Sequence, residues 1–288
     1  MKLTIIIFFV CINIFAQDFN LTLNPSTYYT YGNYNKNKSS QGYSAYASLG
    51  INYYDYITLG FDNTIINDKT EFKYDQKFVI VSGLKNLFPY YIKLNYGYAE
   101  GKYDYKPFEF IYKDYTNLYN ISLTRYFNNF YAGISYSFIN VYGHKGVKIH
   151  QPQLILDWIF MPNLIISYRG IYSKVKSDLP IYEEFLQGEL SDDNRSLYSN
   201  SFSLNYYLSE QLFMRTEVTL GKKAYYFNTD YLTFFNQDDT QNFSFSTKVD
   251  SEIFKNFRIN FSYQYLTLDH SKINYYSVGL KYNFIQLL

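Results

Sequence analysis

The last segment of the chain shows most plainly an alternation of apolar and polar positions that recurs along the sequence. Within residues 274–284, apolar side chains occupy every second position, and the residues between them are mostly small or polar. The apolar set is Tyr276, Val278, Leu280, Tyr282 and Phe284. Because successive side chains of a β-strand point to opposite faces, this pattern predicts a strand with one apolar and one polar face.

Thirteen earlier segments also read as strands, which gives a prediction of 14 strands of about ten residues each, the length that a tilted strand needs to cross a bilayer. The apolar face is clear in most of them, whereas in residues 76–85 the pattern leaves the face ambiguous. The 14 segments are 19–33, 42–54, 56–66, 76–85, 90–100, 117–127, 130–141, 151–160, 164–175, 198–208, 212–222, 241–253, 257–267 and 274–284.

Two kinds of connection alternate between these segments. Tight turns of a few residues follow every second strand, and longer connections rich in Asp, Lys, Asn, Tyr and Gly follow the others, as expected of solvated loops. The longer connections are about 34–41, 67–75, 101–116, 142–150, 176–197, 223–240 and 268–272. In an up-and-down arrangement this regular alternation places all tight turns at one end and all long loops at the other.

An apolar face and a polar face on each strand suit a membrane barrel, in which one face contacts lipid and the other lines the lumen. Unpaired backbone groups are too costly in lipid, so such a sheet closes into a ring. The predicted fold is therefore an all-β, antiparallel, up-and-down transmembrane barrel of about 14 strands. Because the first strand begins close to residue 17, no plug domain is expected. A soluble β-sandwich or β-solenoid is the alternative architecture.

The N-terminus resembles a secretory signal peptide. Lys2 precedes an apolar run from Leu3 to Phe15, and Ala16 follows it. The run is shorter than the roughly 20 apolar residues of a membrane-spanning helix. We expect residues 1–16 to be cleaved, leaving 17–288 as a single barrel domain. Cys11 is the only cysteine, so this cleavage leaves no residue for a disulfide, a thiolate catalyst or a cysteine-based metal site.

Composition and charge narrow the class of protein further. The chain has 37 Tyr and 26 Phe, and aromatic residues make up 22% of it. No long apolar run follows the N-terminal one, which excludes a helical membrane protein. Without Lys2 the 26 basic residues become 25, equal to the 25 acidic ones. This balance argues against nucleic acid as a partner.

Charged residues on the inward face are the candidate functional residues, since a charge facing lipid near the bilayer centre is costly. They are Asp62, Lys93, Asp157, Arg169, Arg215, Glu217, Lys248, Asp250, Arg258 and Lys281. Asp157 and Arg169 flank one short turn and are expected to come within reach of each other. Two roles remain open for the set: internal pairs that fix register and fill the bore, or a charged constriction that sets ion or solute preference. The loops 176–197 and 223–240 are the candidates for folding into the bore.

Catalytic and metal-binding chemistry has little support in the sequence. The three histidines, His144, His150 and His270, are all expected in external loops, and no pair has zinc-ligand spacing with a third protein ligand. Phosphate loops and dinucleotide fingerprints are absent. No cofactor, metal or catalytic residue is therefore predicted, and a barrel that hydrolyses lipids or peptides remains the less favoured alternative.

The C-terminal segment resembles the β-signal by which outer-membrane barrels are handed to their assembly machinery. Ser277, Gly279, Tyr282 and Phe284 fill its pattern of polar, any, Gly, any, any, hydrophobic, any, aromatic; the tail 285–288 departs from it. The whole chain is similar to small porin-like outer-membrane barrels of the kind common in Bacteroidota.

This resemblance implies a Gram-negative outer-membrane location with both termini in the periplasm. It implies outer-membrane lipid and the barrel assembly machinery as partners, together with small solutes or ions. The expected function is a passive porin-like channel. The alternative is a non-conducting structural barrel or a subunit of a surface or secretion complex.

Overall fold

The computed structural model describes residues 20–287 apart from 35–37, 52–54, 69–71, 106–109, 144–145, 179–193 and 236–238. The predicted signal peptide, residues 1–16, lies outside the described residues. No helix in the described part of the chain has the length and hydropathy needed to cross a membrane.

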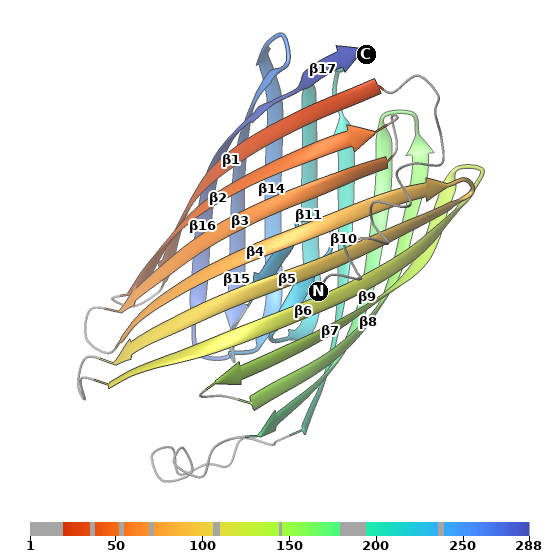
Figure 1. Cartoon of the computed structure of the whole chain (residues 1–288). Coiled ribbons are helices and arrows are strands. Elements are labelled where there is room, and N and C mark those ends of the chain that lie inside the picture. Colours follow the sequence, from red (N-terminus) through yellow and green to blue (C-terminus); the bar gives the residue numbers. More distant parts are fainter. Residues whose placement is uncertain are drawn as a thin grey trace, which may run out of the picture.

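The described residues form a closed antiparallel barrel of 14 strands, which confirms the predicted fold (Figure 1). Each wall strand pairs with its neighbours in sequence, except that β11 pairs with β14, and the ring closes between β1 and β16 in a register that runs from Ser26–Lys281 to Tyr34–Ile273. A break at Asn283 divides the last strand into β16 and β17, and both pieces pair with β1. The wall strands are β1 (Asn20–Tyr34), β2 (Lys38–Ile51), β3 (Asp55–Asp68), β4 (Phe72–Leu87), β5 (Tyr90–Tyr105), β6 (Phe110–Phe127), β7 (Phe130–Gly143), β8 (Gly146–Met161), β9 (Leu164–Asp178), β10 (Asn194–Tyr207), β11 (Leu212–Lys223), β14 (Gln241–Phe254), β15 (Phe257–Leu268), β16 (Lys272–Tyr282) and β17 (Phe284–Leu287).

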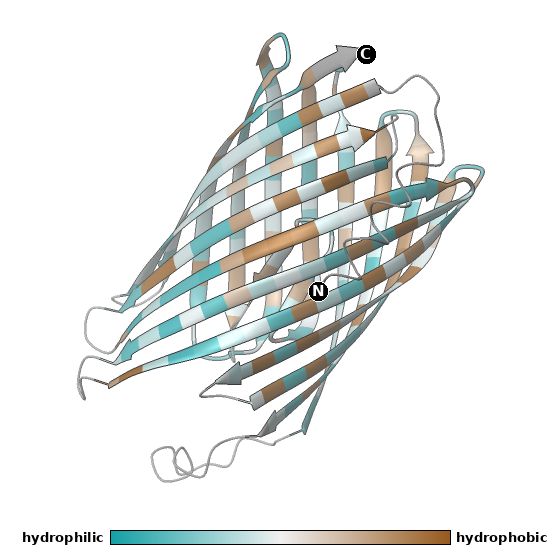
Figure 2. Ribbon diagram, in the orientation of Figure 1, coloured by the Kyte–Doolittle hydropathy of each residue, from teal (hydrophilic) through white to brown (hydrophobic). Residues whose placement is uncertain are grey.

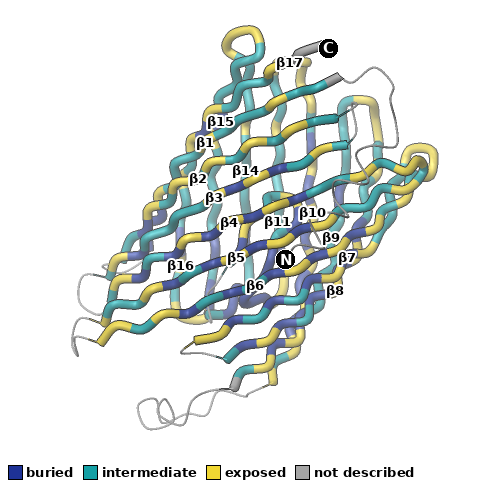
Figure 3. The backbone as a smooth tube through the Cα atoms, viewed as in Figure 1, coloured by how far each residue is buried: buried dark blue, intermediate teal, exposed yellow. Residues whose placement is uncertain are grey.

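The two faces of the wall follow the predicted alternation. Apolar and polar residues alternate along the strands in Figure 2, and exposed and buried positions alternate in Figure 3. In β2, for example, Tyr43 and Leu49 are exposed on the outside, while Ser44 and Ser48 line the interior. The ambiguous strand β4 is resolved by burial: Phe78 and Ile80 point inward and are fully buried, whereas Val79 and Val81 are exposed.

The strands are longer than predicted at the end that carries the long connections. Most of residues 101–116 and 142–150 belong to strands rather than to loops. The pairing continues there because tyrosines keep the alternation: Tyr103 and Tyr112 are cross-strand partners whose rings stack with centroids 4.5 Å apart. Such cross-strand aromatic pairs stabilise a sheet by about 0.2–1 kcal/mol each.

The connection between β11 and β14 contains a small hairpin of its own, β12 (Tyr226–Asn228) paired with β13 (Thr233–Phe235). A register shift between Leu220 and Lys223 marks a bulge just before it, and Gly221 at the bulge has φ +101°. Only glycine adopts this conformation without strain. The bulge bends the end of β11, and the chain then passes inside the ring.

The apolar core of the protein lies where this hairpin meets the inner wall. Ala224, Tyr225, Phe227 and Phe234 of the connection are buried in one cluster with inward-facing residues of the wall. The wall residues in that cluster are Phe78, Ile80, Ala99, Leu118, Ile139, Val141, Val147, Ile149, Val175 and Leu197. Together these contacts explain why several strands are apolar on both faces.

Candidate functional site: the lumen and its internal hairpin

Backbone hydrogen bonds of the hairpin are completed by Gln151, an inward-facing residue of β8. Its amide nitrogen donates to the carbonyl oxygen of Phe227 at 2.9 Å, and its amide oxygen accepts from the backbone nitrogen of Phe227 at 3.2 Å. Both side chains are 0% exposed. Buried polar groups are costly unless they are paired. Gln151 therefore serves as a polar clamp that fixes the hairpin against β8.

Asp230, in the turn between β12 and β13, joins the hairpin to two arginines of the wall. Its carboxylate lies 3.4 Å from the guanidinium of Arg169 and 3.2 Å from that of Arg215. Each arginine also contacts an acid on the wall, Arg169 with Asp157 at 2.7 Å and Arg215 with Glu217 at 2.7 Å. These five residues form the Asp230 cluster.

The charges around Asp230 favour its ionised form. Burial raises the pKa of this carboxyl, but Arg169, Arg215 and Lys93 lower it more, so the net pKa lies below its ordinary value. The side chain is 24% exposed, so solvent screens the attraction only in part. The Asp230 cluster thus attaches the hairpin to the wall by ion pairs, and we call this attachment the latch.

The remaining predicted charges are also placed on the inner wall. Arg258 pairs with Asp250 and lies 3.5 Å from Glu252. Lys93 donates to the carbonyl oxygen of Thr229 in the hairpin at 2.7 Å. The hydroxyl of Tyr46 donates to the carboxylate of Asp62 and lies 2.8 and 2.9 Å from its two oxygens.

Lys248 and Lys281 differ from the other predicted charges. Among the residues that the structure describes, neither ammonium group has a carboxylate within salt-bridge distance, and both side chains line the cavity described below. Their neighbours on the wall pair with one another instead: Arg215 with Glu217, and Asp250 with Arg258.

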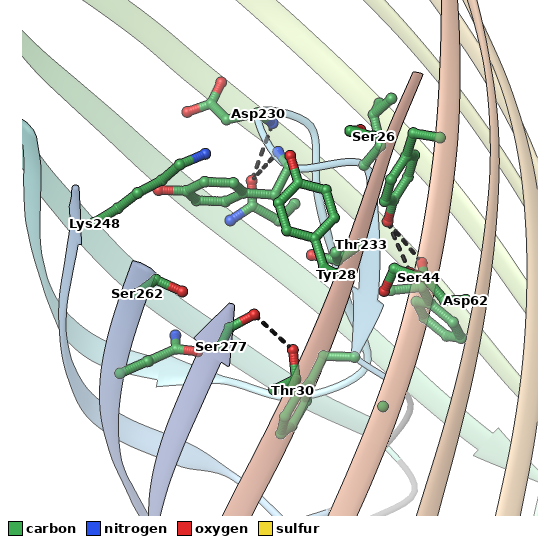
Figure 4. A pocket seen from close by; sticks show the side chains of 18 of the residues that line it. Ser26, Tyr28, Thr30, Ser44, Asp62, Asp230, Thr233, Lys248, Ser262 and Ser277 are labelled. Carbon is green, nitrogen blue, oxygen red and sulfur yellow. Dashed lines mark hydrogen bonds between the residues drawn. The ribbon is translucent and has the colours of Figure 1, made fainter. Parts of the chain in front are cut away.

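A polar cavity of about 790 Å³ occupies the space beside the hairpin (Figure 4). Hydroxyl groups of the opposite wall point into it, including those of Ser26, Ser44 and Ser277. Thr30 and Ser277 are joined across the β1–β16 seam by a hydrogen bond of 2.9 Å. The cavity reaches Thr22, Gly50 and Asp55, which lie near the end of the barrel that carries the short turns.

An apolar layer lies at the other end of the lumen. Six buried residues form it, with Phe235 of β13 packed against them, and all six lie at strand ends that adjoin the long connections. They are Tyr34, Ile66, Tyr74, Leu266, Leu268 and Ile273. The lumen is therefore polar toward the short turns and apolar toward the long connections.

Some functional residues were not predicted from the sequence. Asp230 and Gln151 both contribute to docking of the hairpin, yet Asp230 lies in an irregular connection that has no strand period. Gln151 sits on an inward position, where only charged residues were singled out. The connection 223–240 was a candidate for folding into the bore, and its residues do pack against the inner wall. The apolar run 224–227, followed by Asn-Thr-Asp, is the signal that could have identified the buried part of that connection.

The histidines are distributed differently from the prediction. His150 is not in a loop: it lies on β8, on the outward face, with Nδ1 2.6 Å from the hydroxyl of Tyr136. His270 is 87% exposed and lies 3.2 Å from Asp239. His144 lies outside the described residues, as do the acidic residues of 179–193. Within the described ranges, no group of three or more His, Cys, Asp or Glu could hold a metal ion.

The residues of the predicted assembly signal have structural partners in the seam. Ser277 donates to the carbonyl oxygen of Tyr29 at 3.1 Å. Gly279 lies against the ring of Tyr28, which occupies the space that a Cβ would need. The rings of Tyr282 and Phe284 are in contact, with centroids 4.2 Å apart. The tail after Phe284, which departs from the signal pattern, continues the strand and pairs with residues 20–22.

Comparison with known proteins supports the fold. No family model matches the chain, and no curated protein matches it. Among solved structures, a FadL homologue from Pseudomonas aeruginosa has a TM-score of 0.56 at 8% identity, over 92% of this chain and 90% of that one. The Pseudomonas putida toluene transporter TodX has a TM-score of 0.50 at 6% identity, over 96% of this chain and 91% of that one. The chain therefore has the fold of outer-membrane β-barrels.

Proposed function

We propose that this protein is an outer-membrane channel for small polar solutes or ions, and that the hairpin β12–β13 controls passage through it. The observation that carries the proposal is the hydroxyl-lined cavity of about 790 Å³ inside a closed ring, next to a segment that belongs to a loop rather than to the wall. A polar lumen behind an apolar outer face is the arrangement of water-filled barrels. The transport role of TodX, which has the same type of fold, is consistent with this proposal.

The same proposal includes an orientation. Both ends of the described chain lie at the end of the barrel with the short turns, since residues 20–23 pair with residues 284–287. In bacterial barrels the short turns face the periplasm and the longer loops face outward. We place the polar cavity on the periplasmic side and the apolar layer toward the cell exterior, and we assign the strand β16–β17 as the segment that the assembly machinery engages.

Gating in this proposal depends on undocking of the hairpin from the wall. Hydrogen bonds to charged groups contribute about 1.5–3 kcal/mol each, and a difference of about 1.4 kcal/mol changes an equilibrium tenfold. Asp230→Asn removes the carboxylate that Arg169 and Arg215 share while preserving the size of the side chain. We expect the fraction of time spent open to rise by about 10- to 100-fold.

Single-channel recording in planar bilayers tests the proposal. The purified barrel is compared with Asp230→Asn and with the matched control Asp239→Asn, whose carboxylate contacts His270 and Ser271 outside the hairpin. The proposal predicts discrete current steps that are more frequent in Asp230→Asn and unchanged in the control. A folded barrel that shows no steps in any of the three proteins contradicts it.

A second candidate function is a non-conducting structural barrel. The observation that favours it is the close packing of the hairpin: Ala224 and Phe227 are fully buried in the same cluster as the wall. A permanently filled lumen serves such a barrel well. The recordings above separate the two functions, since a structural barrel stays silent even when the latch at Asp230 is removed.

A further inference from the structure

The polar cavity carries an excess of positive charge that its own residues do not neutralise. Four lysines and four carboxylates line it. The carboxylate of Asp55 is salt-bridged to Lys85, which is not part of the lining. Glu217 and Asp230 belong to the Asp230 cluster, whose two arginines and three carboxylates leave one net negative charge against the four lysines. Among the lining carboxylates that the structure describes, this leaves Asp62 as the one without a cationic partner.

None of the four lysines forms a salt bridge within the described chain, although Asp230 attracts Lys93 and Asp250 attracts Lys248 and Lys281 from beyond salt-bridge distance. Lys93 donates to a neutral carbonyl oxygen, and the ammonium of Lys223 lies 3.9 Å from the centroid of the Tyr226 ring. Lys248 on β14 and Lys281 on β16 face the cavity without a carboxylate within salt-bridge distance in the described chain. Figure 4 shows Lys248 extending toward the cavity from one wall, with Asp62 on another.

Neutral donors lie on one side of Lys248 and of Lys281, and on the other side the register partner of each is an arginine that is salt-bridged to a carboxylate. In register, Lys248 lies beside Ser262, Ser262 beside Ser277, and Ser277 beside Thr30, so a row of hydroxyls crosses the wall at the level of Lys248. Lys281 lies beside Ser26 on β1. Ammonium groups together with hydroxyls provide charge and hydrogen-bond donors for carboxylate or phosphate oxygens.

From this arrangement we propose that the cavity selects small oxyanions, meaning organic carboxylates or phosphate esters with few carbons, and that Lys248 and Lys281 determine this preference. The volume of about 790 Å³ is within the range of about 300–1,000 Å³ of small-molecule sites. A lumen with an excess of one sign of charge concentrates counter-ions in it. This inference rests on the proposed channel function and specifies what the channel takes.

The first test is the reversal potential in a tenfold KCl gradient, measured for the wild type and for the Lys248→Gln/Lys281→Gln double variant. The matched control is Lys148→Gln/Lys174→Gln, which removes two lysines from exposed positions on the outside of the wall. We expect the wild type to prefer chloride over potassium, and the double variant to lose at least about threefold of that permeability ratio. The control is expected to retain the wild-type ratio.

Two results overturn the inference while leaving the channel function intact: a wild-type barrel that prefers potassium, or a double variant with an unchanged permeability ratio.

If no protein conducts, the proposed function fails, and a binding measurement then tests the inference separately. Equilibrium dialysis of radiolabelled inorganic phosphate against the detergent-solubilised barrel is expected to show binding to the wild type and at least threefold weaker binding to Lys248→Gln/Lys281→Gln. Equal binding by both, or none by the wild type, rejects the inference. Circular dichroism that remains mainly β verifies that each variant is folded.

Discussion

Replacing Phe227 by alanine tests the packing of the hairpin while every residue of the wall stays unchanged. The Phe227 side chain is 0% exposed and lies in the main apolar cluster, between the hairpin and the inner face. Truncating a buried phenylalanine to alanine costs about 3–5 kcal/mol, because apolar contacts are lost and a cavity is left. The strands keep all of their ladder hydrogen bonds, so this cost falls mainly on docking of the hairpin rather than on the barrel.

The expected consequence is a large shift toward the undocked state. A cost of about 3–5 kcal/mol corresponds to a change of about 150- to 4,000-fold in the docking equilibrium. An open fraction of about 0.1% in the wild type would become about 10% or more in Phe227→Ala. Single-channel recordings in planar bilayers give the open fraction directly.

Phe254→Ala serves as the control, because Phe254 is 70% exposed at a short turn and lies far from the hairpin in the sequence. Its open fraction is expected to match the wild type. If Phe227→Ala remains folded by circular dichroism but its open fraction equals that of the wild type, the hairpin does not control passage, and the gating proposal is wrong.

Three further predictions follow from the same geometry. Because docking lowers the pKa of Asp230 below its ordinary value of 3.8, the stabilisation is fully present above that value and is lost as the pH falls through the docked pKa; current steps should become more frequent below about pH 4, and an Asp230→Asn barrel that shows the same acid response would refute the assignment. Gly221→Val places a branched side chain at φ +101°, where the carbonyl oxygen of Tyr198 blocks it; limited proteolysis between residues 224 and 235 should accelerate several-fold, and an unchanged cleavage rate would show that the bulge does not direct the hairpin. His150 and His270 face away from the lumen or into solvent, so His150→Ala and His270→Ala should leave any lipid or peptide hydrolysis by the purified barrel unchanged; a loss of hydrolysis in either variant would favour the enzymatic alternative.

The alternation of apolar and polar residues predicts most of this fold, because one face of each strand is directed to the outside of the barrel and the other to its lumen. The faces of β2, β3 and β5 were predictable residue by residue, and so was the proximity of Asp157 and Arg169, since a short turn fixes the register of the two strands that it joins. Strand ends were harder to predict. Tyrosine is compatible with both a loop and a strand, so residues 101–116 read as a loop although they mostly form strands.

The internal hairpin explains the main failures of the sequence reasoning. Strand β4 reads as ambiguous because its inner face is apolar at Phe78 and Ile80, and that inner face is apolar because it packs against the hairpin. The sequence of β4 itself does not indicate which distant segment of the chain packs against its inner face. Asp230 is missed for the same reason: its arginines lie 61 and 15 residues away along the chain, and only the folded hairpin brings them together.

The most direct test of the account asks whether residues 224–235 lie inside the ring. Lys93 on the inner wall contacts the carbonyl oxygen of Thr229, so the Lys93→Cys/Thr229→Cys variant should be joined by a short bismaleimide in intact outer membranes, and the joined barrel should lose its current steps. The paired control, Lys93→Cys/His270→Cys, tests a position at the far end of the barrel and should not crosslink. Efficient crosslinking confined to the first pair is the predicted result; equal crosslinking in both pairs, or none in the first, would contradict an internal hairpin.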